Sequence, residues 1–398
     1  MKELNKISSA GKRGNNVRSD CYFELTLKKH GGINIELTSK VEALYGESIE
    51  KQIKEMCYFF ELKHANVLCE DNGALPFVLA ARFEQAIKKM FPVINREYLL
   101  PFNGKNLYHA AKDKLRRSRL YLPGNEPKFF LNAGLHGPDG IILDLEDSVA
   151  PAEKESAQLI VRNALRSVDF YGAERMVRIN QIPRGLDDLK FIVPHNVHVI
   201  LIPKCESAEQ IKAVENEVLK IKNENGITSN VYFMPIVESA LGVIKAYEIA
   251  TASKYNCALA IGLEDYTADL GTQRTNEGKE SLFARSMLIN AAKAAGIQAI
   301  DTVFSDVSDM EGLKQSVLEA KALGFEGKGC IHPRQIKVVH EAFAPTDEEI
   351  EKAKKIVIAY EEAESKGLGV VSLGSKMIDA PVVKRAQKII EIAKLNKL

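Results

Sequence analysis

The chain has 398 residues, a formal net charge of +1, 45% hydrophobic residues and 27% charged residues. This balance permits a large core, and it provides no general attraction to nucleic acid or a membrane, so neither is expected as a partner. No apolar run approaches the roughly 20 residues of a membrane span, and the N-terminus lacks the apolar core of a secretory signal. The six cysteines are scattered without a C-x-x-C pair. This pattern favours reduced core thiols in a cytoplasmic protein over disulfides or a zinc site.

Residues 1–92 are expected to form a small α/β sandwich domain. The stretches CYFELTLKK and INIELTSK alternate apolar and polar residues around a Gly-Gly pair, which predicts a two-strand hairpin. A helix over residues 41–62 follows, with Ser39 as its expected cap. The stretch ANVLCED predicts a third strand, and residues 73–91 predict a second helix.

After a polar linker over residues 93–115, short apolar stretches alternate with helical segments across residues 116–340. Eight strand-then-helix units predict a (β/α)₈ TIM barrel. The alternative is a doubly wound open sheet, which is disfavoured because no G-x-G-x-x-G or G-x-x-x-x-G-K-[ST] motif is present. Residues 341–398 are expected to form a helical C-terminal segment. The eight expected strands are RLYLP, GIILDLED, RMVRIN, VHVILIPK, VYFMPIVE, CALAIGLED, QAIDTV and GKGCIHP.

Charged residues gather where the predicted barrel strands end, and this end of a barrel carries the active site. A structural ion-pair network explains any single member equally well, but a whole ring of them predicts a functional site. Carboxylates with one histidine and no cysteine suit Mg²⁺ better than Zn²⁺. Lys204 could form a Schiff base, but an ion pair with a neighbouring carboxylate is favoured. The ring consists of Asp144, Glu146, Asp147, Arg178, Asn180, Lys204, Glu206, Glu238, Glu264, Asp265, Asp301 and His332.

The stretch IGLEDYTADLG places three acids directly after a buried strand. Strand alternation predicts that Glu264 points away from its neighbour Asp265. Asp269 is expected to begin the helix that follows. Asp265 is therefore the acid of the three that is expected to have a functional role.

From Arg119 onward the sequence resembles the HpcH/HpaI aldolase/citrate lyase β-subunit family, in the branch that cleaves citramalyl-, malyl- or citryl-CoA. The resemblance implies a Mg²⁺-dependent carbon–carbon lyase that cleaves a 3-hydroxyacyl-CoA thioester to an acyl-CoA and a 2-oxo acid. A citrate lyase component acting on a carrier-bound citryl thioester, a malyl-CoA thioesterase and a non-enzymatic scaffold are the alternatives. The motifs that carry it are SRLYLPGNEPKFF, DGIILDLEDSV, VRIN, PKCES, PIVESALGV, IGLEDYTADLG, QAIDTVFSD, GFEGKGCIHPRQI and GSKMIDAPVVKRAQ.

The same resemblance assigns expected catalytic roles. Glu238 and Asp265 would hold Mg²⁺, and Arg178 would face the substrate carboxylate and the thioester oxygen. Asp379 would be the catalytic carboxylate, carried on a C-terminal helical lid that covers the site of a neighbouring subunit. The resemblance also implies a homotrimer or a multiple of one.

Expected binding and supporting roles follow from the resemblance as well. The side chains of Tyr121 and Lys128, with the backbone at Ile331 and His332, would contact CoA. Four further residues would surround the metal and its waters, namely Asp144, Glu146, Asp147 and Lys204.

The first domain resembles the citrate lyase acyl-carrier (γ) subunit, through SKVEALYGESI and CEDNGALPFVLAARFE. In that family a serine near the N-terminus carries a CoA-derived prosthetic group. When the stretch GNNVRSD is aligned on Asp20, the modified position falls on Arg18, and Ser19 comes one residue later. We therefore expect a domain that keeps the carrier fold without the covalent group, with a modified Ser19 as the alternative.

Overall fold

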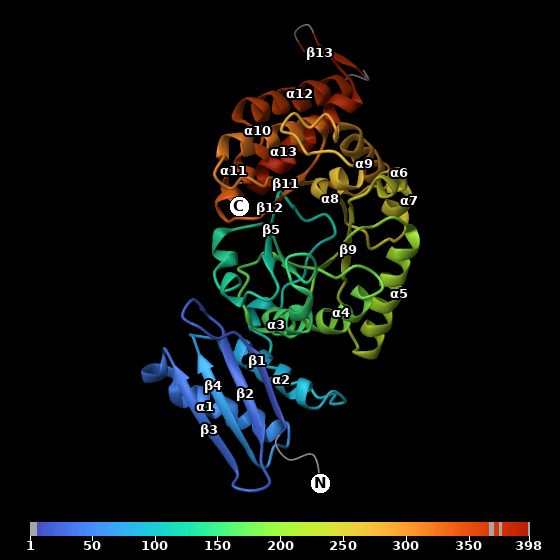
Figure 1. The fold of residues 1–398 in the computed structure, drawn as a ribbon. Coiled ribbons are helices and arrows are strands. Elements are labelled where there is room, and N and C mark those ends of the chain that lie inside the picture. Colours follow the sequence, from blue (N-terminus) through green and yellow to red (C-terminus); the bar gives the residue numbers. More distant parts are fainter. Residues whose placement is uncertain (1–5, 366–369, 374–375, 397–398) are drawn as a thin grey trace.

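A computed structural model describes residues 6–365, 370–373 and 376–396. A small α/β domain lies at one side of a closed barrel, and a helical C-terminal segment lies at the other side (Figure 1). Within the described ranges, no helix has the length and apolar character needed to cross a membrane. All six cysteines are buried free thiols, as the sequence favours.

The N-terminal sheet differs from the predicted hairpin. Its strand order is β1-β2-β4-β3, so β4 lies between the two strands that were expected to pair. β4 runs antiparallel to β2 and parallel to β3. Alternation of apolar and polar residues specifies a strand but not its partner, and β1 was not predicted. The elements are β1 (Ile7–Gly11), β2 (Cys21–Leu27), β3 (Ile33–Ser39), α1 (Glu42–Phe59), β4 (Ala65–Asp71) and α2 (Pro76–Met90).

Ser39 does not cap the first helix. α1 begins at Glu42, and the Ser39 hydroxyl instead donates to Asp71 at 2.6 Å while it accepts the backbone N–H of Val41 at 3.1 Å. The two helices cover one face of the sheet, where alternate strand residues such as Phe23 and Val67 are fully buried.

Helix α2 lies between its own sheet and the barrel helix α3 (Lys154–Ser167) (Figure 1). Nearly all of its side chains are buried, because it is covered on both sides. The Arg82 guanidinium pairs with Asp20 of its own domain and also contacts Ser156 of α3. The N-terminal domain is therefore attached to the barrel through a packed helix pair.

The barrel prediction is confirmed. Eight parallel strands close on each other in the order β5 to β12, with β12 next to β5. Strands such as β8 are buried at every position, as expected for a parallel sheet covered on both faces. The strands are β5 (Ser118–Pro123), β6 (Gly140–Asp144), β7 (Glu174–Arg178), β8 (Val199–Ile202), β9 (Tyr232–Val237), β10 (Ala258–Ile261), β11 (Gln298–Val303) and β12 (Gly327–Cys330).

Helices surround the barrel and follow its strands (Figure 1). After α3 they are α4 (Gly185–Ile192), α5 (Ala208–Glu224), α6 (Ala240–Ile244), α7 (Ala246–Thr251), α8 (Leu263–Asp269), α9 (Leu282–Ala294), α10 (Met310–Leu323) and α11 (Arg334–Phe343). Short 3₁₀ turns are η1 (Gly104–Asn106), η2 (Pro127–Phe129), η3 (Ala133–His136), η4 (Pro151–Glu153) and η5 (Val193–His195).

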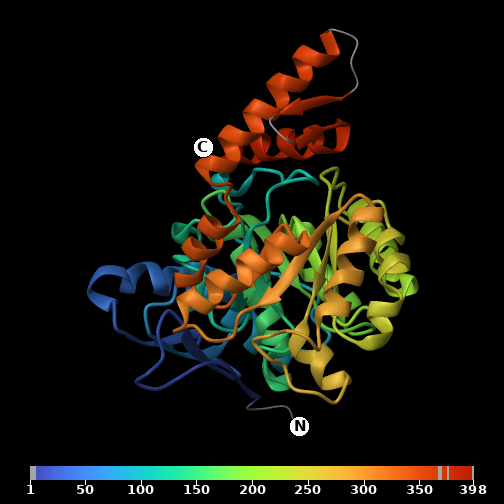
Figure 2. The ribbon, with the colours of Figure 1, turned by 90° about the horizontal axis from the view of Figure 1, so that it is seen from above.

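The C-terminal segment consists of a helix pair with a small hairpin between the helices. It projects from the barrel on the side away from the N-terminal domain (Figure 2). The hairpin was not predicted, and the first two residues of GSKMIDAP, Gly374 and Ser375, lie outside the described residues. The domain limits expected from the sequence stay a prediction. The elements are α12 (Asp347–Ser365), β13 (Val371–Leu373), β14 (Lys376–Ile378) and α13 (Ala380–Asn396).

Candidate active site

The acids of IGLEDYTADLG belong to a helix and not to a strand. β10 ends at Ile261, and Glu264 and Asp265 lie in the first turn of α8, where the helix dipole favours negative charge. Glu264 pairs with Arg274 at 2.6 Å, and Asp265 approaches the ammonium of Lys204 at 3.1 Å. The two acids do have different partners, but strand alternation was the wrong reason for this.

Asp269 is the last residue of α8, so the expectation that it begins a helix is wrong for its own helix. Its carboxylate accepts the backbone N–H of Ala240, the first residue of α6, at 2.8 Å. Asp269 therefore connects two helices on neighbouring sides of the site.

A cavity of about 390 Å³ opens where the barrel strands end. Its walls include apolar residues of β9 and β10, namely Ile236, Ala260 and Ile261. The barrel brings several residues from distant parts of the sequence to this one space, as the strand-end argument predicted. The predicted residues that line it are Tyr121, Asp144, Asp147, Arg178, Glu238, Glu264, Asp265, Asp301 and Ile331.

Glu238 lies directly after β9 and is only 5% exposed. Burial raises the pKa of its carboxyl to about 8, against the hydrogen bond that it accepts from the backbone N–H of Lys204. Gly262 packs so closely that a Cβ there would lie 2.5 Å from Glu238 Oε2. Among the described residues no side-chain cation forms an ion pair with Glu238, and its buried carboxylate occupies a space that only glycine leaves open.

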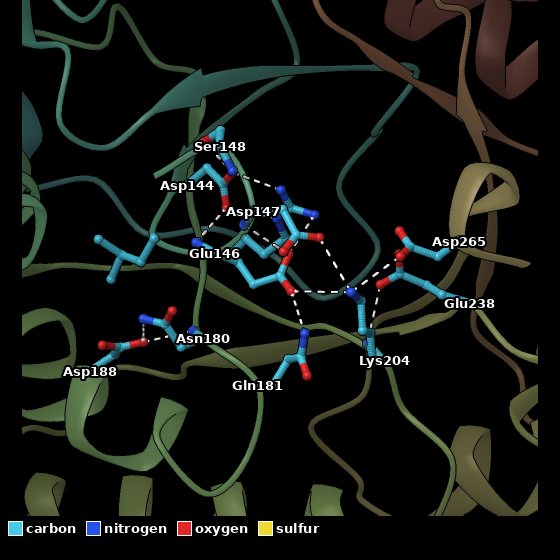
Figure 3. A network of polar contacts seen from close by, with 12 residues as sticks. Asp144, Glu146, Asp147, Ser148, Asn180, Gln181, Asp188, Lys204, Glu238 and Asp265 are labelled. Atoms are coloured by element: carbon cyan, nitrogen blue, oxygen red, sulfur yellow. Dashed lines mark hydrogen bonds and ion pairs between the residues drawn. The ribbon is translucent and has the colours of Figure 1, made fainter. Parts of the chain in front are cut away.

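Lys204 lies between two groups of acids, with Glu146 and Asp147 on one side and Glu238 and Asp265 on the other (Figure 3). Its Nζ is 3.1 Å from Asp265, 3.4 Å from Asp147 and 3.8 Å from Glu146. Burial lowers the pKa of this amine, but the hydrogen bond and charge of Asp265 outweigh burial and raise it overall. Lys204 also has a φ of 48°, a strained conformation for a residue with a side chain. The favoured ion pair for Lys204 is therefore present.

Arg178, the last residue of β7, is held by its neighbour in the sheet. Asp144 is its register partner on β6, and the two side chains form two hydrogen bonds of 2.7 Å each. Burial raises the pKa of Asp144, but the hydrogen bonds from Arg178 and Ser148 lower it overall. The guanidinium also lies 3.1 Å from Glu146 and 5.4 Å above the Tyr121 ring. These contacts fix Arg178 in one orientation at the cavity wall.

Two of the residues expected at CoA, Tyr121 of β5 and Ile331, line the cavity. Lys128 of η2 pairs with Glu126 at 3.1 Å and does not line the cavity. The backbone N–H groups of Ile331 and His332 both point to the side-chain oxygen of Gln335, at 2.8 and 3.3 Å. These two N–H groups therefore already have an acceptor within the chain.

Asp379 lies apart from this group. It directly precedes α13 and accepts the backbone N–H of Val382 at 3.2 Å, as an N-cap does. It is not among the residues that line the cavity of its own chain. The structure therefore does not bring Asp379 to the other expected catalytic residues within one chain.

Three residues of the site were not predicted from the sequence. Gly262 makes room for Glu238, and Gln181 donates to Glu146 at 3.0 Å. Arg119 of β5 also lines the cavity. Alternation along RLYLP, which places residue 119 on the same face as Tyr121, was a signal that could have revealed Arg119.

The donor set fits a hard divalent cation. Glu238 is a buried carboxylate that forms no ion pair within the described part of the chain, and Asp265 has a 42% exposed side chain beside the same cavity. Within the part of the chain that is described, no group of three or more His, Cys, Asp or Glu side chains is spaced to hold a metal. Two carboxylates suit Mg²⁺, which takes its other ligands from water and substrate, and do not suit Zn²⁺.

Comparison with known proteins identifies the family. Residues 117–333 match the family model described as HpcH/HpaI aldolase/citrate lyase. The chain belongs to this family. The citrate lyase subunit beta of Leuconostoc mesenteroides is 42% identical, over 72% of this chain and 96% of the relative. The mitochondrial citramalyl-CoA lyase of Mus musculus is 33% identical, over 70% and 86%.

A solved structure agrees with this assignment. CitE from Mycobacterium tuberculosis, in complex with magnesium, acetoacetate and coenzyme A, matches with a TM-score of 0.58 and 30% identity over 70% of this chain and 98% of that one. Residues 11–90 match a second model, an acyl-carrier family described as the malonate decarboxylase delta subunit. Both expected resemblances are confirmed, and this member of the HpcH/HpaI family is a carbon–carbon lyase.

Proposed function

We propose that the chain is a Mg²⁺-dependent lyase that cleaves a 3-hydroxyacyl-CoA thioester to an acyl-CoA and a 2-oxo acid. The observation that carries the proposal is one cavity lined by an oriented guanidinium, Arg178, and two carboxylates, Glu238 and Asp265. The magnesium, acetoacetate and coenzyme A bound by the CitE neighbour support the same chemistry.

Each residue then has a definite task. Glu238 and Asp265 would hold Mg²⁺, which when bound stabilises negative charge on oxygen as a Lewis acid. Arg178 binds the substrate carboxylate and the thioester oxygen, and its charge stabilises the enolate that forms at that oxygen. Asp144 keeps the guanidinium in position, so no reorganisation is needed during the reaction.

Proton transfer is assigned to Asp379 of a neighbouring subunit. Its carboxylate accepts the proton of the substrate hydroxyl, and the oxygen electron pair forms the carbonyl of the 2-oxo acid. The carbon–carbon bond breaks, and its electron pair passes to the acyl enolate. The proton then returns to the enolate carbon and completes the acyl-CoA. Asp379 does not line the cavity of its own chain, which supports a role across subunits.

A second candidate is a citrate lyase component that acts on a carrier-bound thioester. The β1–β2 loop, where the carrier family bears its prosthetic group, reaches the barrel through an ion pair between Lys12 and Glu126. Arg18, at the position expected to be modified, has no hydroxyl group to which the prosthetic group could be attached. Ser19, the next residue, sits in a strained turn with a φ of 54°. Intact-protein mass decides between the two. We expect the mass of the unmodified chain. An excess that matches a phosphoribosyl-dephospho-CoA group would favour the citrate lyase component that acts on a carrier-bound thioester.

The activity test is a panel of citramalyl-, malyl- and citryl-CoA, with and without Mg²⁺. We expect release of a 2-oxo acid and an acyl-CoA in a strictly Mg²⁺-dependent reaction with at least one thioester. Release of free CoA thiol with an intact hydroxy acid would identify a thioesterase instead. Absence of both products for all three thioesters would refute the proposal.

A further inference from the structure

Arg119 is a buried cation at the base of the candidate active site. It is only 1% exposed, and it lines the same cavity as Arg178 and Glu238. It precedes Tyr121 by two residues on β5, so both side chains point into the barrel and Arg119 lies deeper. The cavity therefore ends at a guanidinium group.

The partners of this guanidinium within the chain are poor. Nη2 donates to the backbone oxygen of Asp301 at 3.3 Å, and Nη1 contacts the sulfur of Met234 at 3.0 Å. Nε has no hydrogen-bond partner, and no carboxylate forms an ion pair with Arg119 in the described residues. Burying a charge without a counter-charge is strongly unfavourable, so a cation in this state calls for an anion from outside the chain.

Two other arginines of the barrel show the usual arrangement. Arg116, three residues earlier, is fully buried and pairs with the fully buried Glu174 through two hydrogen bonds of 2.7 and 2.8 Å. Arg178 is held by both oxygens of Asp144. Arg119 differs from both, because its hydrogen-bonding edge has no carboxylate and borders an open cavity.

We propose that Arg119 forms an anion subsite at the base of the cavity and that the substrate carries a second carboxylate which binds there. The inference rests on the proposed lyase function. The CoA arm is bulky and must leave through the mouth of the cavity, so the far end of the acyl group lies deepest. A thioester whose far end bears an additional carboxylate would yield a 2-oxo dicarboxylic acid. Thioesters that yield pyruvate or glyoxylate have no group to match Arg119.

The test measures binding of 2-oxo acids by isothermal titration calorimetry in the presence of Mg²⁺, with the full-length protein. The probes are oxaloacetate, which has two carboxylates, and pyruvate, which has one. We expect the wild type to bind oxaloacetate at least about 10-fold more tightly than pyruvate. Arg119→Met should weaken oxaloacetate binding by about 10- to 100-fold, as for loss of a charged hydrogen bond, and pyruvate binding by less than about 3-fold.

Two further variants separate a binding role from a structural one. Arg119→Lys keeps the charge, so it should keep part of the preference for oxaloacetate, and it carries the test if Arg119→Met does not fold. Arg119→Met should not lower Tm, because it removes an unpaired charge. Arg116→Met should lower Tm, because it leaves Glu174 buried and alone.

The outcomes are distinguishable. Equal losses for both acids, or unchanged oxaloacetate binding in a folded Arg119→Met variant, would overturn the subsite while the lyase function stands. Wild-type protein that binds neither acid and cleaves none of the thioesters would overturn the proposed function, and the subsite with it.

Discussion

Arg162 of the barrel helix α3 and Glu84 of the N-terminal helix α2 form two hydrogen bonds of 2.9 and 2.7 Å, and both side chains are fully buried. The pair crosses the boundary between the carrier-like domain and the barrel. Asn163 adds a hydrogen bond to the backbone oxygen of Phe77 at 3.0 Å in the same contact. The carrier-like domain is thus fixed to the barrel by a desolvated charge pair.

Breaking this pair should be costly. Arg162→Met removes both hydrogen bonds of the guanidinium to the buried Glu84 carboxylate and leaves it to the partly exposed ammonium of Lys88, 3.3 Å away, which is expected to cost about 3–5 kcal/mol of unfolding free energy. Urea denaturation measures the loss. The control is Glu61→Gln, which breaks an exposed ion pair with Arg96 and should cost less than about 1 kcal/mol. Equal losses of unfolding free energy in the two variants would contradict a stabilising role for the buried Arg162–Glu84 pair.

Asp265→Asn should abolish Mg²⁺-dependent cleavage, with a loss of more than about 100-fold. The neutral amide is a poor ligand for a hard cation, whereas CoA binding should persist. Titration of Mg²⁺ and CoA by calorimetry separates the two effects. Asp269→Asn, in the last turn of the same helix, keeps an oxygen acceptor for Ala240 and should remain active. Full activity of Asp265→Asn would end its assignment as a metal ligand.

Asp144→Asn tests whether Arg178 must be held in place. The amide can accept only part of the double hydrogen bond, so the guanidinium should lose its fixed orientation, and kcat/KM should fall by about 10- to 100-fold. Binding of Mg²⁺ should stay near the wild-type value. The matched control is Asp187→Asn, which breaks an exposed pair with Lys190 on α4 and should change kcat/KM by less than about 2-fold. Wild-type kcat/KM in Asp144→Asn would show that Arg178 needs no such support.

The assignment of Asp379 to a neighbouring subunit makes a complementation experiment possible. Asp379→Ala and Arg178→Ala should each be inactive, and hetero-oligomers of the two should regain part of the activity, because some sites then receive both intact residues. Asp379→Asn is a useful companion, because it can still cap α13 but cannot accept the proton.

The control mixture combines Asp379→Ala with the double variant Asp379→Ala/Arg178→Ala, in which no site can be complete. Activity in this mixture, or none in the first one, would exclude a site shared between subunits. Light scattering on the wild type checks the expected trimer or its multiple.

Acid should destabilise the protein through His195. Burial, followed by the charges of Arg162 and Arg166, lowers the pKa of this histidine to about 3. The unfolded chain therefore binds a proton near pH 6.5 that the folded chain does not, and stability falls as pH drops below this value. Protonation of His195 in the unfolded chain should lower the free energy of unfolding by about 2 kcal/mol between pH 6.5 and 5. His195→Gln should reduce this part of the loss in Tm measured across that range, and an unchanged pH profile would contradict it.

The sequence predicted the barrel well because each strand carries its own signal. Stretches such as VHVILIPK are short, apolar and followed by a helix, and these local features suffice to count the strands. The N-terminal sheet was harder, because strand pairing depends on residues far apart. β4 separates β2 from β3, although only a Gly-Gly turn and a few residues connect those two strands in the sequence.

The site was predictable as a group of residue types but not as a set of contacts. Motif order was enough to single out Arg178, Glu238 and Asp265, which line one cavity. The sequence could not reveal that Lys204 lies among three carboxylates, since their strands meet only in the closed barrel. Glu264 and Asp269 were misplaced because the end of β10 and the start of α8 are separated by Gly262 alone.

By itself, the sequence determined the family, the eight-strand repeat and the residue types at the strand ends, because these depend on local periodicity and short motifs. Only the tertiary structure decided which charges are compensated. Arg116 and Arg119 stand three residues apart in the same basic run, yet Arg116 is buried against Glu174, whereas Arg119 lines the cavity and forms no ion pair with any described carboxylate. The cost of a buried charge depends on partners that the fold brings from distant positions, and no local pattern encodes that difference.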